Sequence, residues 1–434
     1  MDLKKSRKKW LTLQMQMSKL QFFSDKDLIT RLPVLLADTL RGTGIIAPDH
    51  SRVQFCGFVS WSEGTAVFLP VNCCEKNFDV AGAHFLLRAL QRYYDDKITG
   101  VREGLGDEVI GSTSLSLVLL LVDDYLVNGL YVRRAQEYKL NSGKINWSRT
   151  ISRQTGFPSK NSPVYLDLET SLSHYVSDCE TARIHAAVIR EIHSEYGDLL
   201  FGGVQTSDVN LELMPLPSGE LTAQLSYLDR ELSLSYSDRD MNLINALRRY
   251  IERSVGMDDA LLVGTRKFHH VWEAMIDQCL PRGISVNSQL PVPFYLQNEN
   301  YIPVAQKGQR TDTVIENEEG NHVAVVDAKY YRAESPYSAP GWPDIVKQIF
   351  YKTAVESVVP KTTNVSLHFV FPGYKQVLDS AHIGLRTKGP TKIKPVGSDY
   401  PDIYCHYCDP VKLMENYVNG IKNYVLSEKI LNTC

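Results

Sequence analysis

The stretch from Arg310 to Tyr331 constrains what this chain can fold into more than any other part of it. Two runs rich in β-forming residues flank a polar turn at 316–321, and this pattern predicts a β-hairpin. The second run, Val323 to Val326, is apolar without a break, which is typical of a strand buried on both faces. Such a strand belongs to a sheet covered by helices, so the sequence predicts the α/β class, α+β overall.

Charged side chains gather at one end of this predicted hairpin. Asp312 opens the first run, and Asp327 and Lys329 follow the second. Side chains at i and i+2 share a face of a strand, so Asp327 and Lys329 are expected on one side, and Asp312 reaches that side if the register allows it. Adjacent carboxylates repel unless a cation lies between them, which favours Mg²⁺ or a similar hard ion.

A lysine beside such an ion can orient or deprotonate a water molecule and offset charge that builds on a phosphate. The cluster therefore indicates metal-assisted phosphodiester hydrolysis. The alternative is a surface hairpin on which Asp327 and Lys329 pair across solvent.

Helical patterns flank the hairpin on both sides. Apolar residues recur at helical spacing from Phe268 to Ile276 and leave Glu273 off the apolar stripe, where a functional role and a solvated helix face both stay open. The same period returns at 344–351, where Gln348 is favoured as a functional polar group and Tyr351 as a core aromatic. A further strand is expected at 365–371.

This arrangement resembles the PD-(D/E)XK nuclease superfamily, whose core has the order α-β-β-β-α-β. The resemblance implies that Asp312 and Asp327 are metal ligands and that Lys329 is the catalytic lysine. It implies Glu273 and Gln348 as supporting catalytic groups, and Mg²⁺ as the cofactor, for which Mn²⁺ can substitute. Thr311 stands where the superfamily has proline, which bears on the placement of Asp312.

Four strings together resemble the LlaJI family of restriction endonucleases, relatives of the McrC subunit of the McrBC system. They lie at 145–151, 268–276, 325–331 and 347–351. The resemblance implies a DNA endonuclease subunit of a restriction, or antiviral defence, system that acts on double-stranded DNA. It also implies a separate McrB-like AAA+ GTPase partner. Two alternatives stay open: a catalytically silent adaptor that couples DNA to a motor, and a self-sufficient type II-like endonuclease.

The length of 434 residues and the apolar content of 43% predict two or three domains. We expect a mixed α/β domain at 1–110 that docks a partner or binds DNA, a mostly helical region at 111–260, and the nuclease domain at 261–434. The net charge is −3, so any contact with DNA must be local, and the basic loop at 386–394 is one candidate beside its reading as a solvated loop. One site holds one scissile phosphate, so double-strand cleavage needs self-association or repositioning.

Several other functions are disfavoured. Gly143 and Lys144 lack the remaining residues of a Walker A loop, so the chain is not expected to hydrolyse nucleotides alone. Cys405 and Cys408 have no second pair to complete a zinc site. The eight cysteines without a secretory start favour a reducing cytoplasm, and the longest apolar run, 115–122, is too short for a membrane span.

The remaining patterns give a coarse secondary structure. We expect a hairpin at 53–70, a strand at 403–407, and a turn at 143–151 that leads into a packed strand with Trp147 buried. The segment 211–229 reads as irregular, and the basic run at 4–9 opens either an amphipathic helix or a frayed terminus. Helices are expected at 25–41, 82–94, 114–140, 175–196, 241–255 and 410–426.

Overall fold

The structure is a computed structural model. It describes residues 20–433 except 42–44, 47–48, 50, 62–63, 75, 77–78, 99–108, 111, 161, 202–208, 256–261, 305–309, 387–392 and 396–399. The chain divides into two compact units, one made of 1–114, 197–204 and 260–434, and the other of 115–196 and 205–259. Helices and mixed sheets confirm the α/β class. Whether the three expected ranges are separate domains stays a prediction, and the basic run at 4–9 lies outside the described residues.

The first unit contains an N-terminal sheet with the strand order β1-β3-β2-β10-β4. Its strands are β1 (Leu20–Ser24), β2 (Cys56–Trp61), β3 (Gly64–Leu69), β4 (Val109–Ile110) and β10 (Leu262–Thr265). The predicted hairpin at 53–70 is confirmed as β2 and β3. The chain leaves this sheet after β4 and returns to it at β10, which pairs with β4.

Two helices belong to this part of the first unit. α2 (Val34–Arg41) buries Leu36 and Leu40 against the sheet, and α3 (Val80–Ile98) covers the range predicted at 82–94. The helix predicted at 25–41 is too long, because β1 ends at Ser24 and only a 3-10 turn at 29–31 precedes Pro33.

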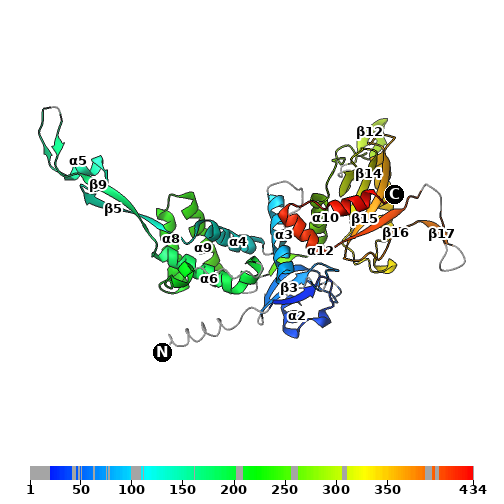
Figure 1. The fold of residues 1–434 in the computed structure, drawn as a ribbon, viewed down its shortest axis with the longest axis horizontal. Helices are drawn as coiled ribbons and strands as arrows, with labels where there is room; N and C mark the ends of the chain where they lie inside the picture. The colour runs from blue at the N-terminus through cyan, green and yellow to red at the C-terminus, as the bar shows by residue number, and fades with distance from the viewer. Residues whose placement is uncertain are drawn as a thin grey trace. The chain divides into compact units, whose positions relative to one another are not determined.

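The same unit contains a C-terminal sheet in the order β13-β14-β15-β19-β16, drawn in yellow to red in Figure 1. β14 runs antiparallel to β13 and parallel to β15, and all of its side chains are buried. This confirms the predicted hairpin and its doubly buried strand. The strands are β13 (Thr313–Glu316), β14 (His322–Ala328), β15 (Asn364–Pro372), β16 (Ser380–Ala381) and β19 (Ile403–Cys408).

Helices cover the C-terminal sheet. α11 packs on the face of β14 that carries Val323 and Val325, while α10 and α13 also contact β14. The predicted helix at 410–426 is two helices, because Gly420 adopts a left-handed conformation with φ of 68° and ends the first. The helices are α10 (Phe268–Cys279), α11 (Trp342–Glu356), α12 (Pro410–Asn419) and α13 (Tyr424–Leu431).

Two small hairpins complete the described part of this unit. β11 (Phe294–Gln297) pairs with β12 (Asn300–Pro303), and β17 (Gly384–Arg386) pairs with β18 (Ile393–Pro395). The hairpin β11–β12 stands between α10 and β13 in the chain and pairs outside the C-terminal sheet. The tip of the basic loop at 386–394 lies outside the described residues.

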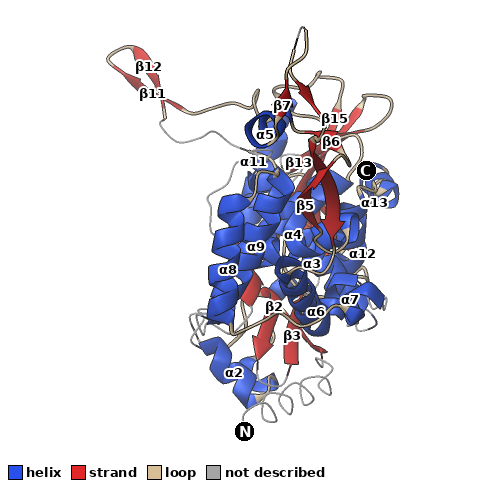
Figure 2. Cartoon of the chain, turned by 90° about the vertical axis from the view of Figure 1, so that its left-hand side faces the viewer, coloured by secondary structure: helices blue, strands red, loops and turns tan. Residues whose placement is uncertain are grey.

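The second unit combines helices with a long two-stranded ribbon. Figure 2 shows α8 and α9 side by side, and Figure 1 shows the ribbon projecting from the helices. The helices are α4 (Ser112–Asn128), α6 (Glu180–Phe201), α7 (Val209–Leu213), α8 (Leu221–Leu234) and α9 (Asp238–Val255). We name the ribbon and the elements at its end, residues 133–176, the arm. The helix predicted at 241–255 is confirmed as α9.

Two helices in this unit differ from their predicted bounds, and one segment differs from its predicted type. The helix expected at 114–140 ends at Asn128, because Gly129 adopts a φ of 70°, and residues 133–140 form a strand instead. The helix expected at 175–196 begins only at Glu180, because the residues before it belong to the partner strand of the ribbon. The segment 211–229 is largely helical, in α7 and α8.

The arm itself consists of short elements around one ribbon. β5 (Arg133–Leu140) pairs with β9 (Glu169–Val176), which also pairs with β6 (Lys144–Ile145). Beyond them lie the helix α5 (Trp147–Arg153) and the strands β7 (Gly156–Phe157) and β8 (Val164–Tyr165).

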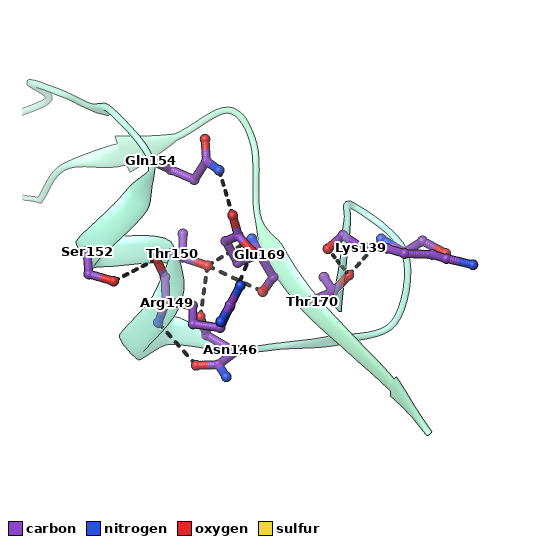
Figure 3. Close-up of polar contacts among 9 residues, drawn as sticks. Lys139, Asn146, Arg149, Thr150, Ser152, Gln154, Glu169 and Thr170 are labelled. Atoms are coloured by element: carbon purple, nitrogen blue, oxygen red, sulfur yellow. Dashed lines mark hydrogen bonds and ion pairs between the residues drawn. The ribbon is translucent and has the colours of Figure 1, made fainter. Parts of the chain in front are cut away.

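Hydrogen bonds fix α5 on the ribbon (Figure 3). The Asn146 side chain caps the helix by accepting from the Arg149 backbone N–H at 3.1 Å. The Glu169 carboxylate accepts a hydrogen bond from the Gln154 side-chain amide at 2.9 Å. The Glu169 backbone N–H donates to the Thr150 hydroxyl at 3.0 Å. The predicted packed strand with a buried Trp147 is therefore wrong: the segment is a capped helix, and Trp147 is 55% exposed.

None of the helices in the described ranges is both long and apolar enough to cross a membrane.

Candidate active site

The register of the hairpin brings Asp312 beside Asp327. Thr313 pairs with Val326, so the residue before Thr313 lies next to the residue after Val326. Asp312 Oδ2 accepts a hydrogen bond from the Ala328 backbone N–H at 3.2 Å, and besides burial the neighbouring Asp327 carboxyl raises the pKa of Asp312. The two carboxyl groups therefore meet at the carboxyl end of the buried strand β14.

Asn287 fixes the backbone just before Asp312. Its side-chain oxygen accepts from the Thr311 N–H at 2.8 Å and from the Thr311 hydroxyl at 2.9 Å, while its amide donates to the Thr311 carbonyl at 3.0 Å. A proline at position 311 would restrict the backbone through its ring. Here the buried Thr311 is held by three hydrogen bonds instead, which fix the backbone that leads into Asp312.

Lys329 lies between two carboxylates. Its Nζ is 3.1 Å from Asp327 Oδ2, on the side of the strand that alternation predicts, and 2.8 Å from Asp344 Oδ1 on the first turn of α11. The hydroxyl of Tyr331 donates to the other oxygen of Asp344 at 3.1 Å. Lys329 and Tyr331 thus reach the same carboxylate from positions two residues apart, just beyond the end of β14.

The charges of the cluster depend on each other. Burial raises the pKa of Asp312 well above its usual value, and the contacting Asp327 carboxyl raises it further, because two adjacent carboxylates resist carrying two negative charges. Burial opposes the charge on Lys329, but Asp327 and Asp344 outweigh it and raise the lysine pKa. Lys329 is therefore an ammonium at neutral pH and the charge partner of both carboxylates.

A hard cation fits the carboxylate pair. Asp327 Oδ2 is buried and has the Lys329 ion pair but no well-oriented hydrogen bond within the described residues, and the Asp312 carboxyl lies against the same group. No set of three or more His, Cys, Asp or Glu side chains in the described part of the chain has metal-binding geometry. Mg²⁺ commonly takes one or two protein carboxylates and completes its shell with waters and phosphate oxygens, so the pair suffices.

The two predicted supporting residues take different positions. Glu273 is half-buried on α10, where burial raises its pKa and the nearby Asp327 charge adds to the shift, so it belongs to the electrostatic surroundings of the pair. Gln348 is fully buried, and its amide donates to the carbonyls of Val325 at 2.9 Å and His368 at 3.2 Å. The structure thus makes Gln348 a tie between β14 and β15, and its part in catalysis stays a prediction.

Sequence reasoning missed four residues of this site: Asn287, Tyr331, Asp344 and Lys347. Burial opposes the charge on Lys347, yet Asp327 is the largest of the groups that raise its pKa, which places a second cation near the carboxylates. Asp344 and Lys347 are one helical turn apart, a spacing that puts both on one face of α11 and could have signalled them. Asn287 has no local signal, because its partner Thr311 is distant in sequence.

The structure thus defines an α/β protein with a carboxylate–lysine cluster at the end of a buried strand. The sequence profile of the LlaJI restriction endonuclease matches residues 55–384. The chain therefore belongs to the LlaJI restriction endonuclease family, and the resemblance that the sequence indicated is confirmed.

Two kinds of relative are similar to this chain. It is 23% identical over 359 residues to the type II restriction enzyme BsuMI component YdjA of Bacillus subtilis (strain 168), covering 77% of this chain and 76% of the relative. A structure of Thermococcus gammatolerans McrB AAA+ hexamers with bound McrC aligns at a TM-score of 0.38 and 13% identity, covering 93% of this chain and 99% of that chain. The cryo-EM structure of the Thermococcus gammatolerans McrBC complex aligns at a TM-score of 0.25 and 11% identity, covering 59% and 88%.

Proposed function

We propose that this chain is the Mg²⁺-dependent DNA endonuclease subunit of a restriction system and hydrolyses phosphodiester bonds of double-stranded DNA. The observation that carries the proposal is the contact between Asp312 and Asp327 with Lys329 Nζ 3.1 Å from Asp327. Membership of a restriction endonuclease family supports the class of reaction. The order of α10, β13, β14, α11 and β15 supports a core of the PD-(D/E)XK type, with one sheet strand fewer before α11 than the order α-β-β-β-α-β.

Each residue has a defined part in this proposal. Asp312 and Asp327 would hold the metal ion, which when bound polarises the scissile phosphate and lowers the pKa of a water molecule. The Lys329 ammonium offsets the negative charge that builds on the phosphate. Lys347 adds a second positive charge on the same side, and Asp344 and Tyr331 orient Lys329.

The arm supports a partner protein as part of this function. Its end carries exposed apolar side chains, among them Trp147, Ile151, Phe157 and Leu166, on elements that hydrogen bonds hold in place (Figure 3). Exposed apolar side chains that gather on one rigid segment mark an interaction surface more often than a solvated one. We infer that a partner docks there, and an AAA+ GTPase is the class that the sequence resemblance implies.

The test is cleavage of plasmid DNA by the purified chain with Mg²⁺, with and without the AAA+ protein and GTP. Nucleotide-dependent double-strand cleavage that needs both proteins supports the proposal in full. Robust cleavage by the chain alone would identify a self-sufficient endonuclease instead. DNA binding without cleavage under every condition, with the Asp327→Ala variant indistinguishable from the wild type, would identify a silent adaptor.

A matched pair of variants tests the docking surface. Trp147→Ala combined with Ile151→Ala removes apolar area from the arm, whereas Tyr236→Ala removes a side chain that is 91% exposed elsewhere in the second unit. Loss of co-purification with the AAA+ protein in the arm variant alone supports docking at the arm. Equal co-purification of both variants would exclude it.

A further inference from the structure

Tyr330 lies directly after Lys329 and points away from the carboxylate cluster, into the interior of the first unit. It is 8% exposed, and its ring centroid lies 5.3 Å from that of Phe268 and 6.3 Å from that of Trp272. Lys329 and Tyr331 contact Asp344, whereas Tyr330 sits in a tight turn between them, closed by the Tyr331 N–H donating to the Lys329 carbonyl at 2.9 Å, and faces the other way.

Residues of the N-terminal sheet surround the phenol of Tyr330. The Val71 backbone N–H donates to the phenol oxygen at 2.9 Å, and Cys56 Sγ lies 3.3 Å from it. Close to the phenol lies the carboxyl group of Asp25, which is 4% exposed and accepts from the Phe55 N–H at 3.0 Å. A buried hydroxyl with this many partners has little freedom to move.

The backbone around Tyr330 is held by the same part of the chain. Lys26 Nζ donates to the Tyr330 carbonyl at 3.2 Å and lies 5.0 Å from the centroid of its ring. The Arg332 guanidinium donates to the Lys26 carbonyl at 3.2 Å. The Asn72 amide donates to the carbonyls of Arg332 and Pro372. Contacts from residues 25–72 thus hold the side chain, the carbonyl and the following residues of the segment that carries Lys329.

We propose that Tyr330 is a positioning residue for the nuclease reaction: the N-terminal sheet fixes Lys329 through the phenol and carbonyl of the residue next to it. This inference rests on the proposed function, since it concerns the same lysine. Tyr330 and Lys329 share a peptide bond, so a shift of the phenol displaces the ammonium. A displacement of about 1 Å in a catalytic group can cost about 100-fold in rate. The N-terminal sheet is then part of the active-site scaffold, in addition to any docking role.

The experiment compares two tyrosines that join the same parts of the first unit. Tyr330→Phe removes the buried hydroxyl and keeps the ring between Phe268 and Trp272. Tyr417→Phe is the control: Tyr417 is 1% exposed, its hydroxyl bonds to Asp96 on α3 at 3.2 Å, and it lies on α12, away from the Lys329 segment. Cys56→Ala is a second test variant that weakens the phenol site without changing Tyr330.

Cleavage by the full chain with its partners gives the first readout. For Tyr330→Phe we expect kcat to fall about 10-fold to 100-fold with the KM for DNA unchanged, because the lysine is misplaced while DNA binding is intact. Cys56→Ala should also lower kcat, but by a smaller factor than Tyr330→Phe. Tyr417→Phe should keep the wild-type kcat. A wild-type kcat in Tyr330→Phe, or an equal loss in Tyr417→Phe, would overturn the inference.

Hydrogen–deuterium exchange gives a readout that needs no activity. The Lys329 N–H donates to the Val370 carbonyl at 3.0 Å and the Tyr331 N–H to the Lys329 carbonyl at 2.9 Å. Tyr330→Phe should speed exchange at these two amides, and Tyr417→Phe should leave them unchanged; equal exchange in both variants would overturn the inference. If the wild type cleaves no DNA, the proposed function fails, and exchange alone still decides whether Tyr330 holds the segment.

Discussion

Lys329 donates to Asp344 at 2.8 Å, so the proposed catalytic ammonium is anchored by a helix as well as by its own strand. Asp344 lies in the first turn of α11, where a carboxylate is favoured by the positive end of the helix dipole. The anchor is therefore made by residues of this chain alone.

The anchor predicts a graded effect at position 344. Asp344→Ala should lower kcat for DNA cleavage about 10-fold, because Lys329 keeps only Asp327 as its partner. Asp344→Asn keeps an oxygen that accepts the hydrogen bond and should retain more activity than Asp344→Ala. Steady-state cleavage assays of both variants check the order, and equal activity of the alanine variant and the wild type would contradict the anchoring role.

Asp327→Ala and Lys329→Ala should each abolish most DNA cleavage. The first removes a metal ligand and the second a charge partner, and single losses of this kind typically cost about 10²–10³ or more in rate. Lys352→Ala is the matched control, since Lys352 is a half-buried lysine of α11 paired with Glu356 at 3.7 Å. Plasmid cleavage with Mg²⁺ and all partners is the measurement, and undiminished cutting by either site variant would remove the assignment.

The oxygen ligands predict the metal preference. Mg²⁺ and Mn²⁺ should support cleavage, while Ca²⁺, which tolerates looser geometry, should suppress it. Cleavage in chelator-treated buffer, restored by one metal at a time, measures this. Activity that returns only with zinc would contradict a carboxylate site for a hard cation.

Asp312 predicts how the stability of the metal-free protein depends on pH. Its pKa is raised in the folded state, so above the unfolded value of about 3.9 the folded chain binds more protons than the unfolded chain, and stability falls as pH rises through the raised pKa. Asp312→Asn removes the cost of ionising this buried carboxyl in the folded state. The variant should therefore have a higher melting temperature than the wild type at neutral pH in the presence of EDTA. Mg²⁺ should raise the wild-type melting temperature and leave that of the variant almost unchanged.

Buried histidines predict that the folded protein loses stability as the pH falls, the opposite of the pH dependence that Asp312 gives. His322, Ser366, His368 and His406 form a hydrogen-bonded chain across β14, β15 and β19. Burial, with a smaller contribution from the Lys429 charge, lowers the pKa of His406 to about 4, so stability is lost as pH falls below the unfolded value of about 6.5. His406→Gln should make the melting temperature fall less steeply between these limits, and an unchanged slope would show that His406 does not contribute.

The correct predictions from the sequence rest on patterns that span only a few residues. The hairpin and the shared side of Asp327 and Lys329 follow from a period of two over a few residues. The partners Asn287, Asp344 and Tyr330 depend on contacts that the chain makes only after folding, so no local pattern reveals all of them. Residues 133–140 were misread because most of their side chains are exposed in the ribbon and show no apolar period. Trp147 was misread because an exposed tryptophan looks in sequence like a core residue.

The pairing of Ile110 with Gly264 places the exit and the return of the second unit on neighbouring strands. On its other side β10 approaches β2 closely: a Cβ atom on Gly264 would lie 2.3 Å from the Cys56 carbonyl oxygen, so this position accepts only glycine. A segment whose two ends meet on adjacent strands can be replaced by a short linker or by another domain without opening the sheet. The chain between these two strands contains the whole second unit, together with 197–204 of the first. Exchanging the arm between family members through this junction would test whether the arm sets the choice of partner.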